Sequence, residues 1–427
     1  MKKIFFKSAL ILLSGVVFIT SCNKDLDQFP EPAPQPAYPV GSGIQGKIAS
    51  NPNDSLYNRL ITISGLSSVL NDNTKSYTIF ATNNNGMKVF VNAISGGLVP
   101  LAAPNSVFSG FLTANITPAT AAAIIQYNTV GQKYSFSTFT GFPNYPVASL
   151  FQLSPTQPFV RSAIFPSTGL INYVNNVPMI DSTINVEASN GIIHHAGTVV
   201  FPPQRVLWER LNTDSNLTIF KAAILRADVG TVNPSTPLGA LVGAFSNGGA
   251  NFNVFAPTNL AMRQLLSALS GGAIPVGNPD ASFIAFINAN VSPVLAKGIV
   301  VYHVFDDRSN TLTTALVKRP GRVFSVNIPM TATTYPTLLS SADTTGVTYP
   351  RLAIAAMFSP TTGLVTSATV KGFVNATASN FLINSTPDSR PSYGLTPPST
   401  PIQYVGTSDQ HYVNGVIHLI DQVLRPQ

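Results

Sequence analysis

The sequence predicts a mixed fold of strands and helices that is built twice in one chain of 427 residues. Tyr77 to Ala81 (YTIFA) matches Phe252 to Ala256 (FNVFA) at an offset of 175 residues, and each segment has the composition of a short strand. Apolar residues at helical spacing follow each strand. A later block, Asn190 to His194, matches Asn414 to His418 at an offset of 224 and opens with Asn-Gly, a turn signal before a strand.

Each first strand leads through a tight turn into an amphipathic helix. In the second copy Pro257 cannot continue a sheet ladder, and Thr258 or Asn259 is placed to cap the helix, an interaction worth about 1 kcal/mol. The apolar stripe occupies positions i, i+3, i+4 and i+7 in both copies. Its members are Met87, Phe90, Val91 and Ile94 in the first copy and Met262, Leu265, Leu266 and Leu269 in the second.

A further helix opens each copy, and Asp54 or Ser55 is the expected N-cap of the first one. The apolar stripes of these helices are Leu56, Leu60 and Ile63 in the first copy and Phe220, Ala223, Ile224 and Ala227 in the second. We therefore place the first copy at residues 44–203 and the second at 204–427. The joint between them, after Pro202-Pro203, is short and is expected to be stiff.

The second copy carries an insertion. Between Tyr127 and Asn190 lie 62 residues, whereas 111 lie between the matching Tyr302 and Asn414, an excess of about 49. Most of the excess falls in a Ser/Thr/Pro-rich stretch at about 331–408. Because loops added to a shared scaffold commonly carry function, this insertion is the predicted specificity element.

Residues 1–21 are typical of an export signal, with three lysines before a short apolar run, Ser8 to Ile19. That run is too short to span a bilayer core of roughly 30 Å. The signal ends in Ile19-Thr20-Ser21-Cys22, which resembles the bacterial lipoprotein box. The resemblance implies that Cys22 is the lipid attachment site and that its acyl chains anchor the protein to a membrane.

Residues 22–43 form a proline-rich segment that favours an extended tether. Asp25 and Asp27 resemble an acidic signal that sends some lipoproteins of the Bacteroides group to the cell surface. We therefore expect a protein anchored by lipid to the outer membrane, at the cell surface or the periplasmic face.

Charge and cysteine content exclude several classes of function. Without the signal, 21 basic and 17 acidic residues leave a net charge of +4, and no run of Lys or Arg exceeds two. A nucleic-acid binder usually concentrates basic residues on one face, so no nucleic-acid partner is expected. Cys22 is the single cysteine, which rules out an intrachain disulfide.

Three blocks of the second copy together resemble the fasciclin (FAS1) family. They are Val254 to Asn259 (VFAPTN), the pair Tyr302-His303, and Asn414 to Asp421 (NGVIHLID) with the tail that follows. In the first copy Thr82-Asn83 stand where Pro-Thr is expected and Asn128 replaces the central histidine, so that copy is degenerate. The resemblance covers about residues 44–426.

The resemblance implies an α+β fold of two tandem FAS1-like modules, each a wedge-shaped β-sandwich with packed helices. It also implies adhesion, or binding of an extracellular protein or glycan ligand, without catalysis or a cofactor. Animal members of the family use the region around the Tyr-His pair in adhesion, which makes Tyr302 and His303 candidate ligand-binding residues. A structural component of an envelope complex is the alternative, and a hydrolase is a weaker one.

The five histidines do not have the spacing of a metal site such as His-Glu-x-x-His, and no metal or catalytic residue is predicted. His418 shares one side of its strand with Val416 and Ile420, so we expect a buried, hydrogen-bonded core residue, and the same for His194. His303 follows an apolar run and is expected to be structural. His195 and His411 are the two histidines expected to be exposed.

Overall fold

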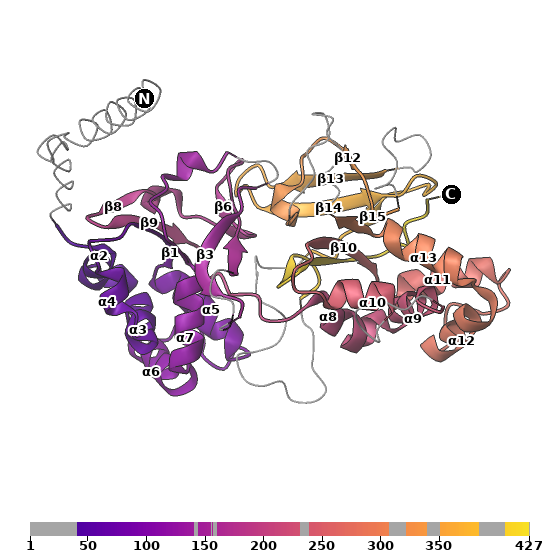
Figure 1. The fold of residues 1–427 in the computed structure, drawn as a ribbon, viewed down its shortest axis with the longest axis horizontal. Helices are drawn as coiled ribbons and strands as arrows, with labels where there is room; N and C mark the ends of the chain where they lie inside the picture. The colour runs from indigo at the N-terminus through magenta and orange to yellow at the C-terminus, as the bar shows by residue number, and fades with distance from the viewer. Residues whose placement is uncertain are drawn as a thin grey trace, which may run out of the picture. The chain divides into compact units, whose positions relative to one another are not determined.

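The computed structural model describes residues 41–140, 144–154, 156, 160–230, 239–306, 322–339, 351–383 and 406–426. Residues 41–427 form one compact unit (Figure 1). Helices and several small sheets share that unit, which agrees with the predicted α+β class. The predicted signal, Cys22 and most of the tether lie outside the described residues.

Helices and strands of the first copy come in the order that the second copy repeats. They are α2 (Ile44–Ser50), α3 (Ser55–Ser64), α4 (Ser67–Leu70), β1 (Tyr77–Thr82), α5 (Asn84–Ile94), α6 (Asn105–Asn115), α7 (Pro118–Tyr127), β2 (Thr129–Val130), β3 (Val147–Gln152), β4 (Arg161–Ile164), β5 (Pro166–Ser167), β6 (Tyr173–Val174), β7 (Val177–Pro178), β8 (Val186–Ala188) and β9 (Gly191–Ala196).

The second copy has a counterpart for each of the first copy's helices and for the strands at the centre of its sheet. Its elements are α8 (Leu207–Thr213), α9 (Thr218–Ala227), α10 (Ala240–Ser246), β10 (Phe252–Pro257), α11 (Asn259–Leu269), α12 (Asp280–Asn290), α13 (Pro293–Tyr302), β11 (Val304–Asp306), β12 (Thr333–Tyr335), β13 (Leu352–Phe358), β14 (Val365–Lys371), β15 (Ser379–Asn380), β16 (Gln410–Tyr412) and β17 (Gly415–Ile420).

A parallel pair of strands forms the centre of each copy. β1 pairs in parallel with β9, and β10 pairs in parallel with β17 in the same register. The antiparallel neighbours also correspond, because β2 and β8 flank the first pair as β11 and β16 flank the second. The two copies therefore share one topology, as the sequence repeat predicts.

Both faces of each central pair are covered. In the first copy Ile79 and Ile193 pack on the helices, whereas Phe80 and Ala196 pack on the opposite side against the remaining strands. Figure 1 shows the helices α3, α5, α6 and α7 gathered below β1 and β9. All six residues of each central strand are buried for this reason, so the strands do not alternate between core and solvent.

An Asn-Gly pair fixes the start of each closing strand. The Asn414 side chain accepts a hydrogen bond from the Leu207 backbone N–H (2.8 Å) and donates to the carbonyls of Phe245 (2.8 Å) and Asn247 (3.0 Å). Asn190 makes the equivalent contacts to Ile44 N–H and to the Leu70 and Asp72 carbonyls. One side chain thus holds the beginning of one helix and the end of another against the strand.

The glycine of each pair allows two backbones to approach closely. A Cβ at Gly415 would lie 2.2 Å from the Phe252 carbonyl oxygen, and one at Gly191 would lie 2.1 Å from that of Tyr77. No other residue fits in either place without moving the parallel partner strand. The repeated Asn-Gly is therefore required by tertiary packing as well as by the hairpin between β16 and β17.

The predicted insertion of the second copy is partly a folded layer. Strands β12 to β15 form a four-stranded sheet inside it. Leu352, Ile354 and Val370 of that sheet pack in one cluster with Phe255 of the central strand. The expectation of an added surface loop is therefore wrong for β12 to β15, because their apolar face covers the core. Residues 340–350 and 384–405 of the insertion lie outside the described residues.

The two copies contact each other directly. Phe165 of the first packs with Phe324 and Val416 of the second, and the Arg322 guanidinium lies 5.3 Å from the centre of the Phe165 ring. The Asn144 amide donates to the Arg322 carbonyl at 2.6 Å. Apolar packing, a cation–π contact and this hydrogen bond join the two copies, and the stiffness of the joint stays a prediction.

Within the described residues, no individual helix has both the length and the apolar composition needed to cross a membrane, although the bent pair α6 and α7 meets those two criteria jointly.

The Asn414 contacts predict a large effect of one substitution. Asn414→Ala removes the side-chain partner of the buried Leu207 N–H and of the Phe245 carbonyl, and one of the two hydrogen bonds to the Asn247 carbonyl. This should lower the free energy of unfolding of the second copy by about 3 kcal/mol. Urea unfolding followed by the fluorescence of Trp208, the single tryptophan of the chain, measures this directly. Asn290→Ala on the exposed end of α12 is the matched control and should change stability by less than about 0.5 kcal/mol. Equal effects of the two substitutions would contradict the assigned role.

Candidate functional site

Both candidate residues of the Tyr-His pair lie inside the core. Tyr302 and His303 are 0% exposed. Tyr302 accepts a hydrogen bond from the Phe373 backbone N–H at 3.1 Å. Burial lowers the pKa of His303 to about 4, so the ring is neutral at pH 7. Direct contact with a ligand would require these side chains to leave the core, and the ligand-binding role of the pair stays a prediction.

The pair has a structural role that the first copy reproduces with another residue. His303 Nδ1 donates to the Ile299 carbonyl at 2.7 Å, and Nε2 accepts from the Leu424 backbone N–H at 2.8 Å. Asn128 in the first copy donates to the Ile124 carbonyl (2.8 Å) and the Val200 carbonyl (2.7 Å). Both side chains therefore tie the end of a helix to the final segment of their copy. Asn128 therefore replaces the histidine and keeps this connection.

The histidines of the closing strands are buried and hydrogen-bonded, as predicted. His418 and His194 are 0% exposed, and each donates from Nε2 to a backbone carbonyl at 2.9 Å. Their Nδ1 atoms accept backbone N–H groups from Asp409 and Asn185, two corresponding residues with positive φ. Burial lowers the pKa of His194 to about 4 and also lowers that of His418.

The prediction that His195 and His411 are exposed is wrong. His195 is 4% exposed and His411 is 0% exposed. His195 lies on β9, where both faces of the strand are covered. His411 lies at the contact between the copies, where its Nε2 faces Arg322 and its Nδ1 lies 3.4 Å from the Tyr127 hydroxyl. Burial, and then the Arg322 charge, places the pKa of His411 well below its usual value.

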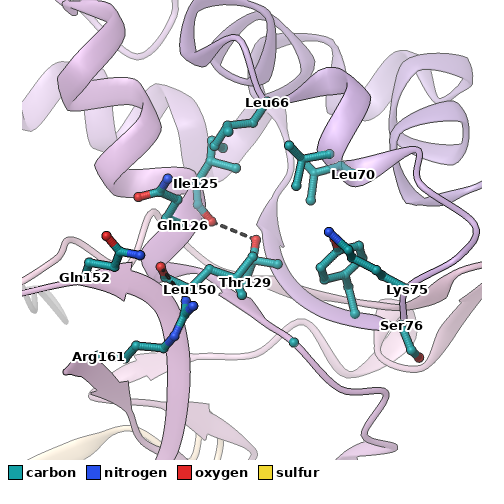
Figure 2. Close-up of a pocket in the computed structure, with 13 residues that line it drawn as sticks. Leu66, Leu70, Lys75, Ser76, Ile125, Gln126, Thr129, Leu150, Gln152 and Arg161 are labelled. Atoms are coloured by element: carbon teal, nitrogen blue, oxygen red, sulfur yellow. Dashed lines mark hydrogen bonds between the residues drawn. The ribbon is translucent and has the colours of Figure 1, made fainter. Parts of the chain in front are cut away.

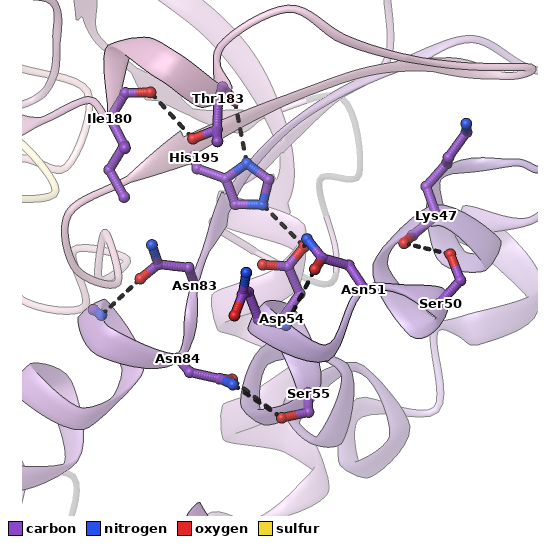
Figure 3. A network of polar contacts seen from close by, with 12 residues as sticks. Lys47, Ser50, Asn51, Asp54, Ser55, Asn83, Asn84, Ile180, Thr183 and His195 are labelled. Atoms are coloured by element: carbon purple, nitrogen blue, oxygen red, sulfur yellow. Dashed lines mark hydrogen bonds and ion pairs between the residues drawn. The ribbon is translucent and has the colours of Figure 1, made fainter.

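His195 belongs to a buried ion pair that the sequence analysis did not find. Its Nε2 lies 3.1 Å from Oδ2 of Asp54, which is 2% exposed and immediately precedes α3. Its Nδ1 lies 3.2 Å from the Thr183 carbonyl oxygen. Asn51 donates to the same Asp54 oxygen at 2.8 Å. Figure 3 shows these groups around the imidazole ring.

The two neighbours of the ring favour its charged form. Because a carboxylate and a carbonyl both accept hydrogen bonds, only an imidazolium can donate to both of them. Burial lowers the pKa of His195, but the hydrogen bond and charge of Asp54, and then the Thr183 carbonyl, raise the pKa above its usual value of 6.5. An imidazolium in this position has no lone pair to accept a proton, so the pair is built to hold a charge and not to act as a base.

The ion pair lines a pocket of about 210 Å³ whose walls are rich in amide groups. Asn83 caps α5 by accepting the Gly86 N–H at 3.0 Å, and it lines the pocket together with Asp54. Oδ1 of Asp54 has no hydrogen-bond partner in the described part of the chain. The remaining lining residues are Asn51, Asn53, Asn84, Asn85 and Thr183.

The second copy shows that the fold does not require this polar pair. Leu217 occupies the position of Asp54, and Leu419 occupies the position of His195. Both leucines are buried, at 0% and 1% exposure. Because a buried ion pair is often no more stabilising than an apolar pair of similar volume, scaffold stability alone does not account for Asp54 and His195. Their placement in a pocket makes them candidates for function.

One sequence signal points to this site. The repeat aligns His194 with His418 but aligns His195 with Leu419, a residue type of the core. That alignment indicates a buried histidine without a histidine counterpart. Among the residues that the structure describes, no group of three His, Cys, Asp or Glu side chains is placed to hold a metal ion.

Comparisons with known proteins add one finding. No family model and no curated protein match the chain. Among solved structures, the chain is similar to a FAS1 domain pair from the insect cell adhesion molecule Fasciclin I, at 12% sequence identity and a TM-score of 0.33. The similarity covers 87% of this chain and 96% of that chain. The topology that the two copies share is established by the strand pairing within this chain and not by that similarity.

The ion pair predicts a loss of stability as the pH rises above 6.5. A raised folded-state pKa of His195 contributes stability that is complete below pH 6.5 and is lost as the pH rises through that pKa. Asp54→Leu with His195→Leu, which reproduces the second copy, should keep the fold and remove this alkaline loss. Urea unfolding at pH 6 and pH 9, followed by circular dichroism, measures the difference.

The single substitutions serve as controls for the double variant. Replacing either partner alone leaves a buried polar group without its charge partner and should cost about 3–5 kcal/mol. The buried histidines with lowered pKa values titrate below pH 6.5 and do not contribute to the alkaline window. A double variant that loses the same stability between pH 6 and pH 9 as the original protein would refute the assignment.

Proposed function

We propose that this protein is a lipid-anchored binding protein of the bacterial cell envelope that captures a hydroxyl-rich ligand, such as a glycan, in the pocket beside Asp54 and His195. The observation that carries the proposal is a polar, amide-lined pocket beside Asp54 and His195 in the first copy, where the counterparts of these two residues in the second copy are buried leucines. The same proposal includes two FAS1-like modules, a role in adhesion and the absence of catalysis.

The chemistry of the pocket supports a glycan. A sugar hydroxyl both donates and accepts hydrogen bonds, and an asparagine amide offers both a donor group and an acceptor. Asn53 and Asn85 are exposed at the rim, and neither side chain makes a hydrogen bond within the described residues. Asp54 adds a negative charge to the wall of the pocket, where it is paired with His195.

The anchor supports a role in the envelope. Ile19-Thr20-Ser21-Cys22 would place lipid on the first residue of the mature chain, and the proline-rich segment would hold the folded unit away from the membrane. A tethered module samples a small volume, which raises the effective concentration of weak binding sites. Weak pockets are then sufficient for adhesion between a cell and a repetitive glycan.

Ligand binding by the rim amides can be measured on a glycan array with the full chain in detergent. Asn53→Ala with Asn85→Ala should lower the affinity for the bound glycan about thirtyfold, because two hydrogen bonds to the ligand are lost at about 1 kcal/mol each. Asn115→Ala with Asn290→Ala, two exposed asparagines elsewhere, is the matched control. Binding that is insensitive to the rim pair, or a stoichiometric envelope partner with no glycan binding, would favour the assembly role instead.

Lipid attachment has its own test. Cys22→Ser should move the protein from the membrane fraction to the soluble fraction, and mass spectrometry of the original protein should find acyl groups on Cys22. An unmodified thiol on the mature protein would reject the anchor while leaving the pocket assignment untouched.

A further inference from the structure

The first copy contains a second pocket that the proposed function does not use. It has a volume of about 520 Å³ and lies between α4, the end of α7 and strands β1 to β4 (Figure 2). Its apolar walls come from Leu66, Leu70, Ile125 and Leu150. Polar side chains complete the lining, so the pocket presents apolar surface and hydrogen-bonding groups side by side.

Two cations stand on opposite sides of this pocket, as Figure 2 shows. Arg161 donates from Nη1 to the Leu150 carbonyl at 2.9 Å, which holds its guanidinium at the edge of the sheet. Lys75 is 64% exposed, and its nitrogen lies 3.7 Å from Asp72. The Asp72 carboxylate already accepts the backbone N–H (2.9 Å) and hydroxyl (2.6 Å) of Thr74. The lining itself has two positive charges and no acidic side chain.

Polar groups between the cations are suited to a hydroxylated ligand. Gln126 on α7 and Gln152 on β3 point their amides toward the same side of the pocket in Figure 2. Gln126 is half-buried, and Gln152 is exposed. Each amide can donate to and accept from a hydroxyl group.

The second copy is apolar at the corresponding positions. Ala250 corresponds to Lys75, Val301 to Gln126, and Val304 to Thr129. All three are buried, and Leu338 and Leu339 pack against the cluster that contains them. The second copy thus folds with apolar side chains at these positions. The open pocket and the charges of the first copy are therefore not needed for folding.

We infer that this pocket binds an acidic saccharide, with the carboxylate of one uronic acid unit held by Arg161 and that of another by Lys75. A guanidinium matches a carboxylate in a two-point hydrogen bond, and a lysine adds a second charge without fixed geometry. The glutamine amides contact the hydroxyl groups, and the apolar walls contact the C–H face of the sugar ring. The inference extends the proposed glycan binding to a second site and depends on it only for the class of ligand.

The test uses isothermal titration calorimetry on the full chain in detergent. The probes are a galacturonic acid trisaccharide and its methyl ester, which keeps the hydroxyl groups and removes the charge. The acidic probe should bind at least tenfold more tightly than the ester at 25 mM salt, and the difference should shrink at 500 mM salt because the charges are exposed. Equal binding of acid and ester would overturn the inference.

Variants locate the binding. Arg161→Gln with Lys75→Gln should lower the affinity for the acidic probe at least tenfold and leave the thermal midpoint unchanged. The control, Lys297→Gln with Lys371→Gln, removes the same charge from two exposed lysines of the second copy. An acidic probe that binds both double variants equally would refute the site. Tighter binding of a hexaglutamate peptide than of the saccharide would refute the ligand class.

The rim variant Asn53→Ala with Asn85→Ala separates this inference from the proposed function. It should weaken neutral glycan binding and leave the acidic probe unaffected, because the two pockets share no lining residue. Loss of acidic binding in the rim variant would count against the second site. Failure of the rim variant on neutral glycans, with the charge variants behaving as expected, would reject the proposed function and keep the second site.

Discussion

The parallel pairing of each copy's first strand with its closing strand is the constraint on which the rest of the fold depends. These strands are far apart in sequence, and a parallel pair needs a long connection between them. In both copies the connection supplies three of the helices on one face and further strands on the other, and the helices before the first strand complete the helical face. The Asn-Gly pair sets where the closing strand begins, since the asparagine holds two helix ends and the glycine lets the strand approach its partner. Burial of both sheet faces then follows.

Because the chain contains two copies of one scaffold, each residue can be compared with its counterpart in the other copy. Where both copies have the same contact, as at His194 and His418, the scaffold accounts for the residue. The Asn128 and His303 positions differ in residue type but connect the same two segments, so they also belong to the scaffold. A polar group in one copy at a place where the other is apolar needs a different explanation.

The first copy has two such departures, and both line pockets. Asp54 and His195 form a buried charged pair where the second copy has leucines, and Lys75 and Gln126 face a pocket where it has alanine and valine. Both of these pockets lie in the first copy, the one with the degenerate motif. The second copy uses its added strands β12 to β15 to extend the core instead.

Much of the scaffold could be predicted from the sequence. Apolar residues at helical spacing mark the helices, and the segments that recur at offsets of 175 and 224 mark the central strands of both copies. The first strands, the closing strands, the helices behind them and the Thr258 cap all lie where the patterns place them. The burial of His195 could not be read from alternation, since the strand is covered on both faces. The folded layer in the insertion was missed because its strands lie in a stretch rich in Ser, Thr and Pro and have no counterpart at the repeat offsets.

The pockets could not be predicted from the sequence for a further reason. Asp54 and His195 are 141 positions apart, and Lys75 and Arg161 lie on different elements, so only the tertiary fold brings each pair together. Sequence patterns identify the apolar face of an element but not the polar groups that meet across elements. The repeat alignment gave a partial signal, because it pairs His195 with Leu419. A residue-by-residue comparison of the two copies would have detected it.

Hydrogen–deuterium exchange of the full chain tests the central constraint most directly. If the parallel pairs hold both copies together, the amides of Gly191–Ala196 and Gly415–Ile420 should exchange last, together with those of β1 and β10. Closing strands that exchange as fast as the exposed ends of α6 and α12 would contradict the account.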